Sequence, residues 1–187
     1  MRISTAASLA LGCLLVLASS TAFGNMIENG DFESGGVGFG TQYQVAFSNM
    51  GEPGQMTVSS MASDWNEDFS NPAPAAGLSL IASGSTSVYN AVWASTIAVQ
   101  SGKTYQVSFN GAALTSGDEQ AKLQFYVSPN PDDPVSKVAV SGAMIDLAGA
   151  DNNWLLASGS FTASHDGTVS VFIHNLNNSP TGNNFAI

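Results

Sequence analysis

Apolar and polar residues alternate along most of the chain after residue 24, in short runs of the kind that form β-strands. The runs are separated by Gly, Ser, Asn, Pro and Asp, which favour turns, and the 3.6-residue period of a helix is hard to find. The pattern predicts strands at residues 42–47, 55–60, 78–82, 91–99, 104–110, 122–128, 137–140, 154–162 and 168–176, with one more opening at 185–187.

About ten short strands without crossover helices are typical of an all-β fold. The sequence therefore predicts a two-sheet antiparallel jelly-roll β-sandwich that occupies residues 25–187 as a single domain. We expect no helix longer than about three turns. Five aromatic side chains should be buried between the sheets: Phe32, Trp93, Phe109, Phe125 and Phe161.

Residues 1–24 have the features of a cleavable signal peptide. A single Arg precedes an apolar stretch at 9–18, and small side chains stand at the two positions that a signal peptidase reads before Asn25. The stretch is too short to span a membrane. Cys13 could accept a lipid anchor, but no Leu stands three residues before it, which favours ordinary cleavage. We therefore expect a secreted protein, extracellular or at the cell surface.

Charge is sparse and one-sided. Lys103, Lys122 and Lys137 are the only basic side chains after the leader, against fourteen Asp and Glu, and the whole chain has a net charge of −10. Such a surface repels nucleic acid and anionic membranes, and it suits cations or neutral polar ligands. The single cysteine lies in the leader, so the domain cannot be a disulfide scaffold.

Few residues could support catalysis. His165 and His174 are the only imidazole bases, and their settings, a turn and a strand, favour structural roles. The chain has no Gly-x-Ser-x-Gly elbow, His-Glu-x-x-His pair or Walker loop. Glu28, Asp31 and Glu33 are similar to the acidic triplet of sandwich-fold glucanases, but on a strand Glu28 would face away from the other two. The sequence therefore predicts a non-catalytic protein, with a hydrolase as the least favoured alternative.

Two groups of residues have the chemistry of a sugar-binding site, which needs a ring to stack on and acceptors for hydroxyls. Asp64, Trp65 and Asn66 supply it in the longest predicted loop, and Tyr126 with Gln124 supplies it on one face of a predicted strand. The two groups could act together only if the loop folds over the sheet that carries Tyr126. The alternative for the loop is that Trp65 packs back on the sandwich.

A candidate metal site directly follows the leader. In the segment Asn29-Gly30-Asp31-Phe32-Glu33, a strand would bury Phe32 and place Asp31 and Glu33 together on the other face. Two carboxylates beside a glycine turn can bind a hard cation such as calcium. The alternative is a first strand with a solvated acidic face.

Several segments together carry a family resemblance: residues 29–33, 91–93, 99–105, 123–127, 153–154, 159–163, 175–177 and 182–187. In their order and spacing, the chain resembles a family of bacterial exported β-sandwich domains. These domains are of the galactose-binding-like, carbohydrate-binding-module type that is often found in PEP-CTERM surface proteins. The resemblance spans nearly the whole of residues 25–187.

The resemblance implies both a metal and a ligand. In such domains the Glu that matches Glu33 helps to hold a structural calcium, opposite an acidic residue of the last strand. The family continues the segment matching 182–187 with Asp-Asp-Ile, so we expect the last strand and the calcium site to be incomplete in this sequence. The implied function is non-catalytic binding of an extracellular polysaccharide or cell-surface glycan. The alternative is a structural or interaction protein of the cell envelope or biofilm matrix, without a sugar pocket.

Overall fold

The computed structural model describes residues 25–72, 77–117, 119–130, 136–150 and 152–187, and its regular structure is almost entirely β. The elements are β1 Gln44–Val45, β2 Gln55–Ser59, the 3₁₀ helix η1 Ala62–Asp64, β3 Ser79–Ser83, β4 Ala91–Val99, β5 Thr104–Ala113, β6 Lys122–Ser128, β7 Val138–Asp146, β8 Leu155–Thr162, β9 Gly167–Asn175 and β10 Asn184–Ala186. Each strand predicted from the alternation is present, although β1 is shorter and β7 longer than expected.

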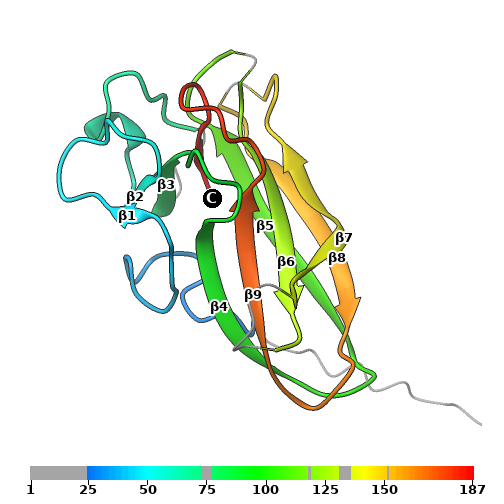
Figure 1. Ribbon diagram of the computed structural model, residues 1–187. Helices are drawn as coiled ribbons and strands as arrows, with labels where there is room; N and C mark the ends of the chain where they lie inside the picture. The colour runs from blue at the N-terminus through cyan, green and yellow to red at the C-terminus, as the bar shows by residue number, and fades with distance from the viewer. Residues whose placement is uncertain (1–24, 73–76, 118, 131–135, 151) are drawn as a thin grey trace, which may run out of the picture.

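The strands form two sheets that pack face to face (Figure 1). One sheet has the order β1-β2-β3-β10-β5-β8, and the other has the order β4-β9-β6-β7. From β3 onward the chain passes to the other sheet after every strand except β6. The two-sheet β-sandwich is therefore confirmed, with one difference. β1 and β2 run parallel, whereas all the other paired strands are antiparallel.

Alternate residues of each strand point into the space between the sheets. On β6, Leu123 and Phe125 join the main apolar core, while Gln124 and Tyr126 point to the outer face of the four-stranded sheet. Phe185 of β10 is fully buried in the same core. Of the five aromatic residues expected there, Phe32, Trp93 and Phe125 are buried.

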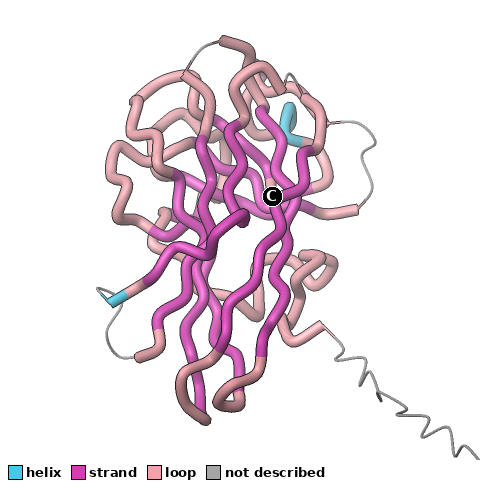
Figure 2. Tube along the Cα trace, turned by 90° about the vertical axis from the view of Figure 1, so that its right-hand side faces the viewer, coloured by secondary structure: helices cyan, strands magenta, loops and turns pink. Residues whose placement is uncertain are grey.

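Phe109 and Phe161 are only partly buried, which corrects the prediction. Both lie on the β5–β8 pair, and β10 reaches only Ala112 and Ala113 of β5. The first half of β5 therefore has no neighbouring strand on the β10 side within the described residues. The sandwich is open along this part of β5, and Figure 2 shows strands that run well past the C-terminus, which directly follows β10.

The opposite side of the sandwich is closed by β7 and β8, which belong to different sheets. Between two of its pairings with β6, β7 has four residues, 140–143, where β6 has only Phe125, so β7 bulges. Gly142 lies in this bulge with φ +82°, and an added Cβ would stand 2.9 Å from the carbonyl oxygen of Ser158 on β8. A Cβ on Gly159 of β8 would collide with the carbonyl oxygen of Ser141. Two glycines therefore let the two sheets meet backbone to backbone.

A second apolar cluster covers the outer face of the six-stranded sheet. Ile81 of β3 and Ala186 of β10 point outward, whereas their neighbours in the chain, Leu80 and Phe185, point into the main core. The β1–β2 loop and the β2–β3 loop fold over these outward residues. The buried members of the cluster are Ala46, Met50, Ala62, Phe69, Ile81, Leu114 and Ala186.

Residues 27–34 form turns and not the strand that their alternation suggested. The Asn29 side chain donates from Nδ2 to the carbonyl oxygens of Gly35 and Val37, at 2.8 and 2.7 Å, and its Oδ1 accepts from the backbone N–H of Ser34. Asn29 and Phe32 both have positive φ, 50° and 60°, which a strand does not permit. Phe32 still reaches the core, where it packs edge-to-face on Phe39.

The predicted signal peptide, residues 1–24, lies outside the described residues. Within the described part of the chain, none of the helical structure has the length and apolar character needed to cross a bilayer.

Candidate functional site

The loop group predicted to bind sugar lies over the outer face of the six-stranded sheet. Asp64 ends η1 and is exposed. Trp65 is partly buried against the second apolar cluster, and its carbonyl oxygen accepts from the N–H of Met50 at 2.7 Å. Asn66 donates to the carbonyl oxygen of Met50, also at 2.7 Å. The loop therefore uses Trp65 and Asn66 to hold itself on the sheet, and of the three predicted residues only Asp64 is exposed.

The strand group lies on the outer face of the other sheet. Tyr126 is half-buried there, whereas Gln124 is only 8% exposed. The Gln124 amide donates to the carbonyl oxygens of Phe125, Val140 and Ala143, at 2.8 to 3.1 Å. These carbonyls lie at the β7 bulge, so Gln124 supplies hydrogen bonds that the interrupted strand pairing leaves out. Its role in this structure is to hold the bulge.

The two predicted groups do not form one site. Trp65 packs with the outward residues of β3 and β10, on one sheet. Tyr126 points outward from β6, on the other sheet. The two outer faces look away from each other across the whole sandwich, so the loop does not fold over the sheet that carries Tyr126.

The candidate calcium ligands are near the open side of the sandwich. Glu33 is exposed, and its Oε1 accepts from the backbone N–H of Leu78 at 2.8 Å. Asp31 Oδ1 accepts from the backbone N–H of Glu33 at 3.3 Å. Calcium takes six to eight oxygen ligands, and no group of three or more His, Cys, Asp or Glu gathers anywhere in the described residues. These two carboxylates alone do not complete a site, and calcium binding stays a prediction.

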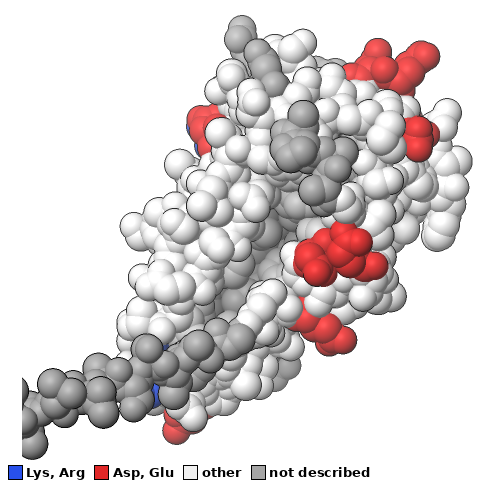
Figure 3. All heavy atoms as spheres, turned by 180° about the vertical axis from the view of Figure 1, so that it is seen from behind, with Lys and Arg blue, Asp and Glu red and all other residues white. Residues whose placement is uncertain are grey.

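A groove opens beside β5 near the end of β10, and we call it the β5 groove. It has a volume of about 530 Å³ and is lined by Asn25, Ile27, Gly30, Asp31, Phe32, Ser60, Pro72, Gly77, Leu78, Ser79, Trp93, Ser108, Phe109, Asn110, Phe125, Trp154, Ile173 and Ile187. Figure 3 shows this side of the molecule hollowed, with acidic side chains beside the depression.

The β5 groove lies between β3 and β5 and over the inner face of the four-stranded sheet. β3 and β5 are both neighbours of β10, and Ile187 continues this contact by pairing with Leu80 through two backbone hydrogen bonds of 2.9 and 3.0 Å. The inner face of the four-stranded sheet forms the floor through Trp93 and Phe125. A second hollow of about 400 Å³ follows β5 from Thr104 to Ser108, with residues 25–27 also on its wall.

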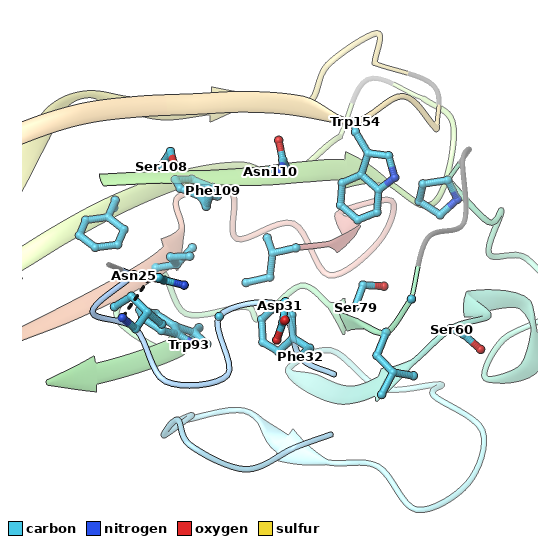
Figure 4. A pocket seen from close by; sticks show the side chains of 18 residues that line it. Asn25, Asp31, Phe32, Ser60, Ser79, Trp93, Ser108, Phe109, Asn110 and Trp154 are labelled. Carbon is cyan, nitrogen blue, oxygen red and sulfur yellow. Dashed lines mark hydrogen bonds between the residues drawn. The ribbon is translucent and has the colours of Figure 1, made fainter. Parts of the chain in front are cut away.

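Aromatic rings dominate the walls of the β5 groove. In Figure 4 the indole of Trp154 points into the hollow from one wall, while Phe32 and Trp93 lie on the opposite side. Asp31 and Ser79 add oxygen atoms to this opposite side, whereas the side chains of Ser108 and Asn110 on β5 point away from the hollow. Flat apolar rings with a few polar atoms at the edge are suited to a ligand that has both an apolar face and hydroxyl groups.

Among the described residues, the lining of the β5 groove has no pair of carboxylates of the kind that glycoside hydrolysis requires. Glycoside hydrolysis uses two carboxylates about 5–10 Å apart across the scissile bond, and Asp31 is the only acidic residue among the described residues that line the groove. Neither histidine lines it. His165 is exposed in the turn before β9, and His174 is buried on the outer face of β9. The arrangement can bind a ligand, but it offers no acid–base pair.

Sequence reasoning did not identify the β5 groove. Phe109 was expected to be buried in the core, but it lines the groove, as Trp154 also does. Phe109 lies where the first half of β5 has no strand on the β10 side among the described residues, and such a neighbourhood depends on strand order, which alternation along the chain does not record.

Comparison with known proteins shows which solved structures have a similar fold. No protein-family model and no curated protein matches the chain. Among solved structures, it is similar to the N-terminal CBM22-1–CBM22-2 tandem of Xyn10C from Paenibacillus barcinonensis, at 15% identity and a TM-score of 0.54, over 83% of this chain and 40% of that chain. It is also similar to the CBM22-1–GH10 modules of xylanase 10B from Clostridium thermocellum, complexed with xylohexaose, at 13% identity and a TM-score of 0.51, over 83% of this chain and 26% of that chain.

The chain thus spans less than half of each of these two solved chains. At such low identities the similarity shows the fold alone, a β-sandwich like that of CBM22 domains. The carbohydrate-binding-module part of the resemblance is supported in this coarse sense, and the association with PEP-CTERM surface proteins stays a prediction.

Proposed function

We propose that the protein is a secreted, non-catalytic β-sandwich module that binds a neutral extracellular polysaccharide in the β5 groove. One observation carries the proposal: an open hollow of about 530 Å³ has Trp93, Trp154 and Phe109 among its lining residues and Asp31 as its one described charge. A pyranose ring offers a weakly apolar face to the aromatic walls and hydroxyls to the polar atoms. The net charge of −10 favours a neutral ligand over an anionic one in this groove.

The solved structures suggest which polysaccharide to try first. One similar structure is a pair of CBM22 domains, and another is a CBM22-1–GH10 structure complexed with xylohexaose. A linear β-linked xylan chain is therefore our first candidate ligand. A groove that continues along β5 from Asn110 to Thr104 suits a linear chain better than a single sugar.

The test is binding of xylohexaose and of a panel of neutral polysaccharides to residues 25–187, measured by calorimetry and affinity electrophoresis. Trp154→Ala should weaken binding about 10- to 100-fold, because it removes a stacking ring worth about 1–3 kcal/mol. Tyr89→Ala is the matched control, because Tyr89 is 78% exposed and does not line the groove. Equal binding by the Trp154→Ala variant and the parent would overturn the groove as the site.

A second variant separates lost binding from lost folding. Trp154 also packs on the second apolar cluster, so its removal is expected to lower stability as well. Asp31 is exposed and needs no partner in the core, so Asp31→Asn should leave the melting temperature within about 2 °C of the parent. It removes a charge from the groove wall, and a measurable change in glycan affinity is expected.

Trp65 and Tyr126 stay separate candidates for sugar contacts on the two outer faces. Each is partly exposed and on a different sheet. If either face binds glycan, replacing its aromatic residue by Ala should weaken binding by about 1–3 kcal/mol while Trp154→Ala has no effect. The same titrations therefore rank all three surfaces.

The alternative function is a structural or interaction protein, and the free edge of β5 favours it. Thr104 to Asn110 pair with β8 on one side and have no strand on the other within the described residues. Such an edge is a template for an extended peptide from another chain. Concentration-dependent association in sedimentation velocity, with no binding to any glycan, would favour this alternative. Association that xylohexaose suppresses would place both functions in the same groove.

A further inference from the structure

The outer face of the four-stranded sheet carries a basic and aromatic cluster at some distance from the β5 groove. Lys137 Nζ lies 3.1 Å from Nε2 of His174 and 5.4 Å from the centroid of the Tyr126 ring. Tyr126 meets His174 edge-to-face, with centroids 5.2 Å apart, and the Phe172 ring is 6.0 Å from His174. None of these four residues lines either hollow along β5.

The charge of Lys137 has no carboxylate partner among the described residues. Lys122 shows the contrast, because its Nζ forms a 2.8 Å ion pair with Asp146 at the other end of the β6–β7 pair. An ammonium group has three donors, and the one hydrogen bond of Lys137 to a described residue is to His174. Lys137 is thus partly buried and makes no ion pair with a described carboxylate, in a chain of net charge −10.

His174 fixes the position of this ammonium group without competing for an anion. It is 2% exposed. Burial first, and then the positive charge of Lys137, lower the pKa of His174 to about 4 against an opposing effect of the Val88 backbone. The imidazole is therefore neutral near pH 7, and its Nε2 accepts the proton of Lys137. The remaining donors of Lys137 are then available beside the half-buried ring of Tyr126.

We propose that Lys137 and Tyr126 form a separate sub-site for the carboxylate of an acidic sugar residue, with the Tyr126 ring stacking on the sugar and the Lys137 ammonium binding its carboxylate. The inference rests on the proposed function, since it assumes that the protein binds glycans. It extends that function from neutral chains to chains with uronic acid residues. His174 is a positioning residue, and Phe172 supports its ring.

The test compares two probes of equal length, an oligogalacturonate and the corresponding neutral galactose oligosaccharide, on residues 25–187 at constant ionic strength. Lys137→Met should weaken oligogalacturonate binding about tenfold or more, the usual cost of a charge-assisted hydrogen bond, and should leave neutral-oligosaccharide binding unchanged. Lys103→Met is the matched control, because Lys103 is exposed and its loss changes the net charge equally. Lys137→Arg keeps the charge and should retain most of the oligogalacturonate affinity.

The outcomes separate this sub-site from the groove. Equal loss of oligogalacturonate binding in the Lys137→Met and Lys103→Met variants would overturn the sub-site, as would competition by acetate as strong as by galacturonic acid. Binding of oligogalacturonate that depends on Lys137, with no xylohexaose binding, would overturn the neutral groove and support the sub-site. Binding of xylohexaose that depends on Trp154, with no oligogalacturonate binding, would do the reverse.

Discussion

The two long sides of the sandwich are built in opposite ways. On one side β7 and β8 bring the sheets into backbone contact at Gly142 and Gly159. On the other side β5 runs past the end of β10, and Phe109 and Phe161 are left partly exposed. Strands with a similar alternation of inward and outward residues border both sides. The difference teaches that two glycines and a bulge bring the sheets together on one side, whereas on the other side the first half of β5 has no described strand beside it.

The largest expected effect contrasts two phenylalanines. Phe185 is fully buried where β10 joins β3 and β5, and Phe109 lies on the wall of the groove. Phe185→Ala should cost about 3–5 kcal/mol of unfolding free energy, and Phe109→Ala about 1–2 kcal/mol, because part of its surface is already in water. Urea unfolding measures both. Equal costs would mean that the groove wall is as closed as the core.

A fall in pH should lower the free energy of unfolding through His174, which lies on β9 of the four-stranded sheet. His174 has a pKa of about 4 in the folded protein against 6.5 as a free side chain. Between these values the unfolded chain binds a proton that the folded one does not, so stability present above pH 6.5 is lost as the pH falls toward 4, by up to about 3 kcal/mol.

Urea unfolding at pH 7, 5.5 and 4 checks this dependence. His174→Gln should remove most of the slope between pH 6.5 and 4. The hydrogen bond from Lys122 is the main cause of the lowered pKa of the Asp146 carboxyl. Because the ordinary pKa of this carboxyl is 3.8, it changes the stability of the protein only at a lower pH than His174 does. An unchanged slope in the variant would exclude His174 as its cause.

The close backbone contact between β7 and β8 can be tested at Gly159. Gly159→Ala should cost about 2–3 kcal/mol, because the new methyl group would strike the backbone of Ser141 and force β7 away from β8. Gly36→Ala is the control, since its added Cβ would meet nothing within 4 Å. Thermal and urea unfolding compare the two variants. A cost no larger than that of the control would show that the two sheets can separate freely at this edge.

Calcium is expected to give the smallest effect, at the open side. If Glu33 helps to bind calcium with a dissociation constant near 1 mM, 1 mM calcium adds RT ln 2, about 0.4 kcal/mol. Differential scanning calorimetry with calcium, and with magnesium as a control ion, measures the shift. Glu33→Gln should abolish it, whereas Glu52→Gln, at another exposed carboxylate, should not. A shift that survives the loss of Glu33 would place the ion elsewhere.

Much of the fold could be predicted because alternation reports on strands that have one face in a core. β4, β6 and β9 were placed closely by this pattern. The segment at Asn29 misled for a physical reason: Asp-Phe-Glu alternates like a strand, but the Asn29 side chain makes three hydrogen bonds that fold the backbone into a turn. Such local side-chain-to-backbone competition is not visible in the period of the hydrophobic residues.

The candidate sites were harder to predict, because they depend on which faces meet. Trp65 and Tyr126 each have suitable chemistry, but assignment of their strands to sheets places them on opposite outer faces. The Gln124 side chain has the hydrogen-bonding groups of a sugar-binding residue. In the structure its amide donates to the carbonyl oxygens of Val140 and Ala143 at the β7 bulge. The groove joins residues 25–32 to β5 and Trp154, and no local motif records such distant neighbours.

The position of β10 has a consequence for how the chain can assemble during synthesis. β10 comes after all the other strands in the sequence, yet it lies between β3 and β5 in the middle of the six-stranded sheet. A ribosome releases the N-terminal strands first. The β1–β3 part and the β5–β8 part of this sheet can therefore be joined only after residues 184–186 have been synthesised. Such long sequence separation slows folding. Completion of this sheet is therefore a late event, and the chain stays an incomplete sandwich until its central strand arrives.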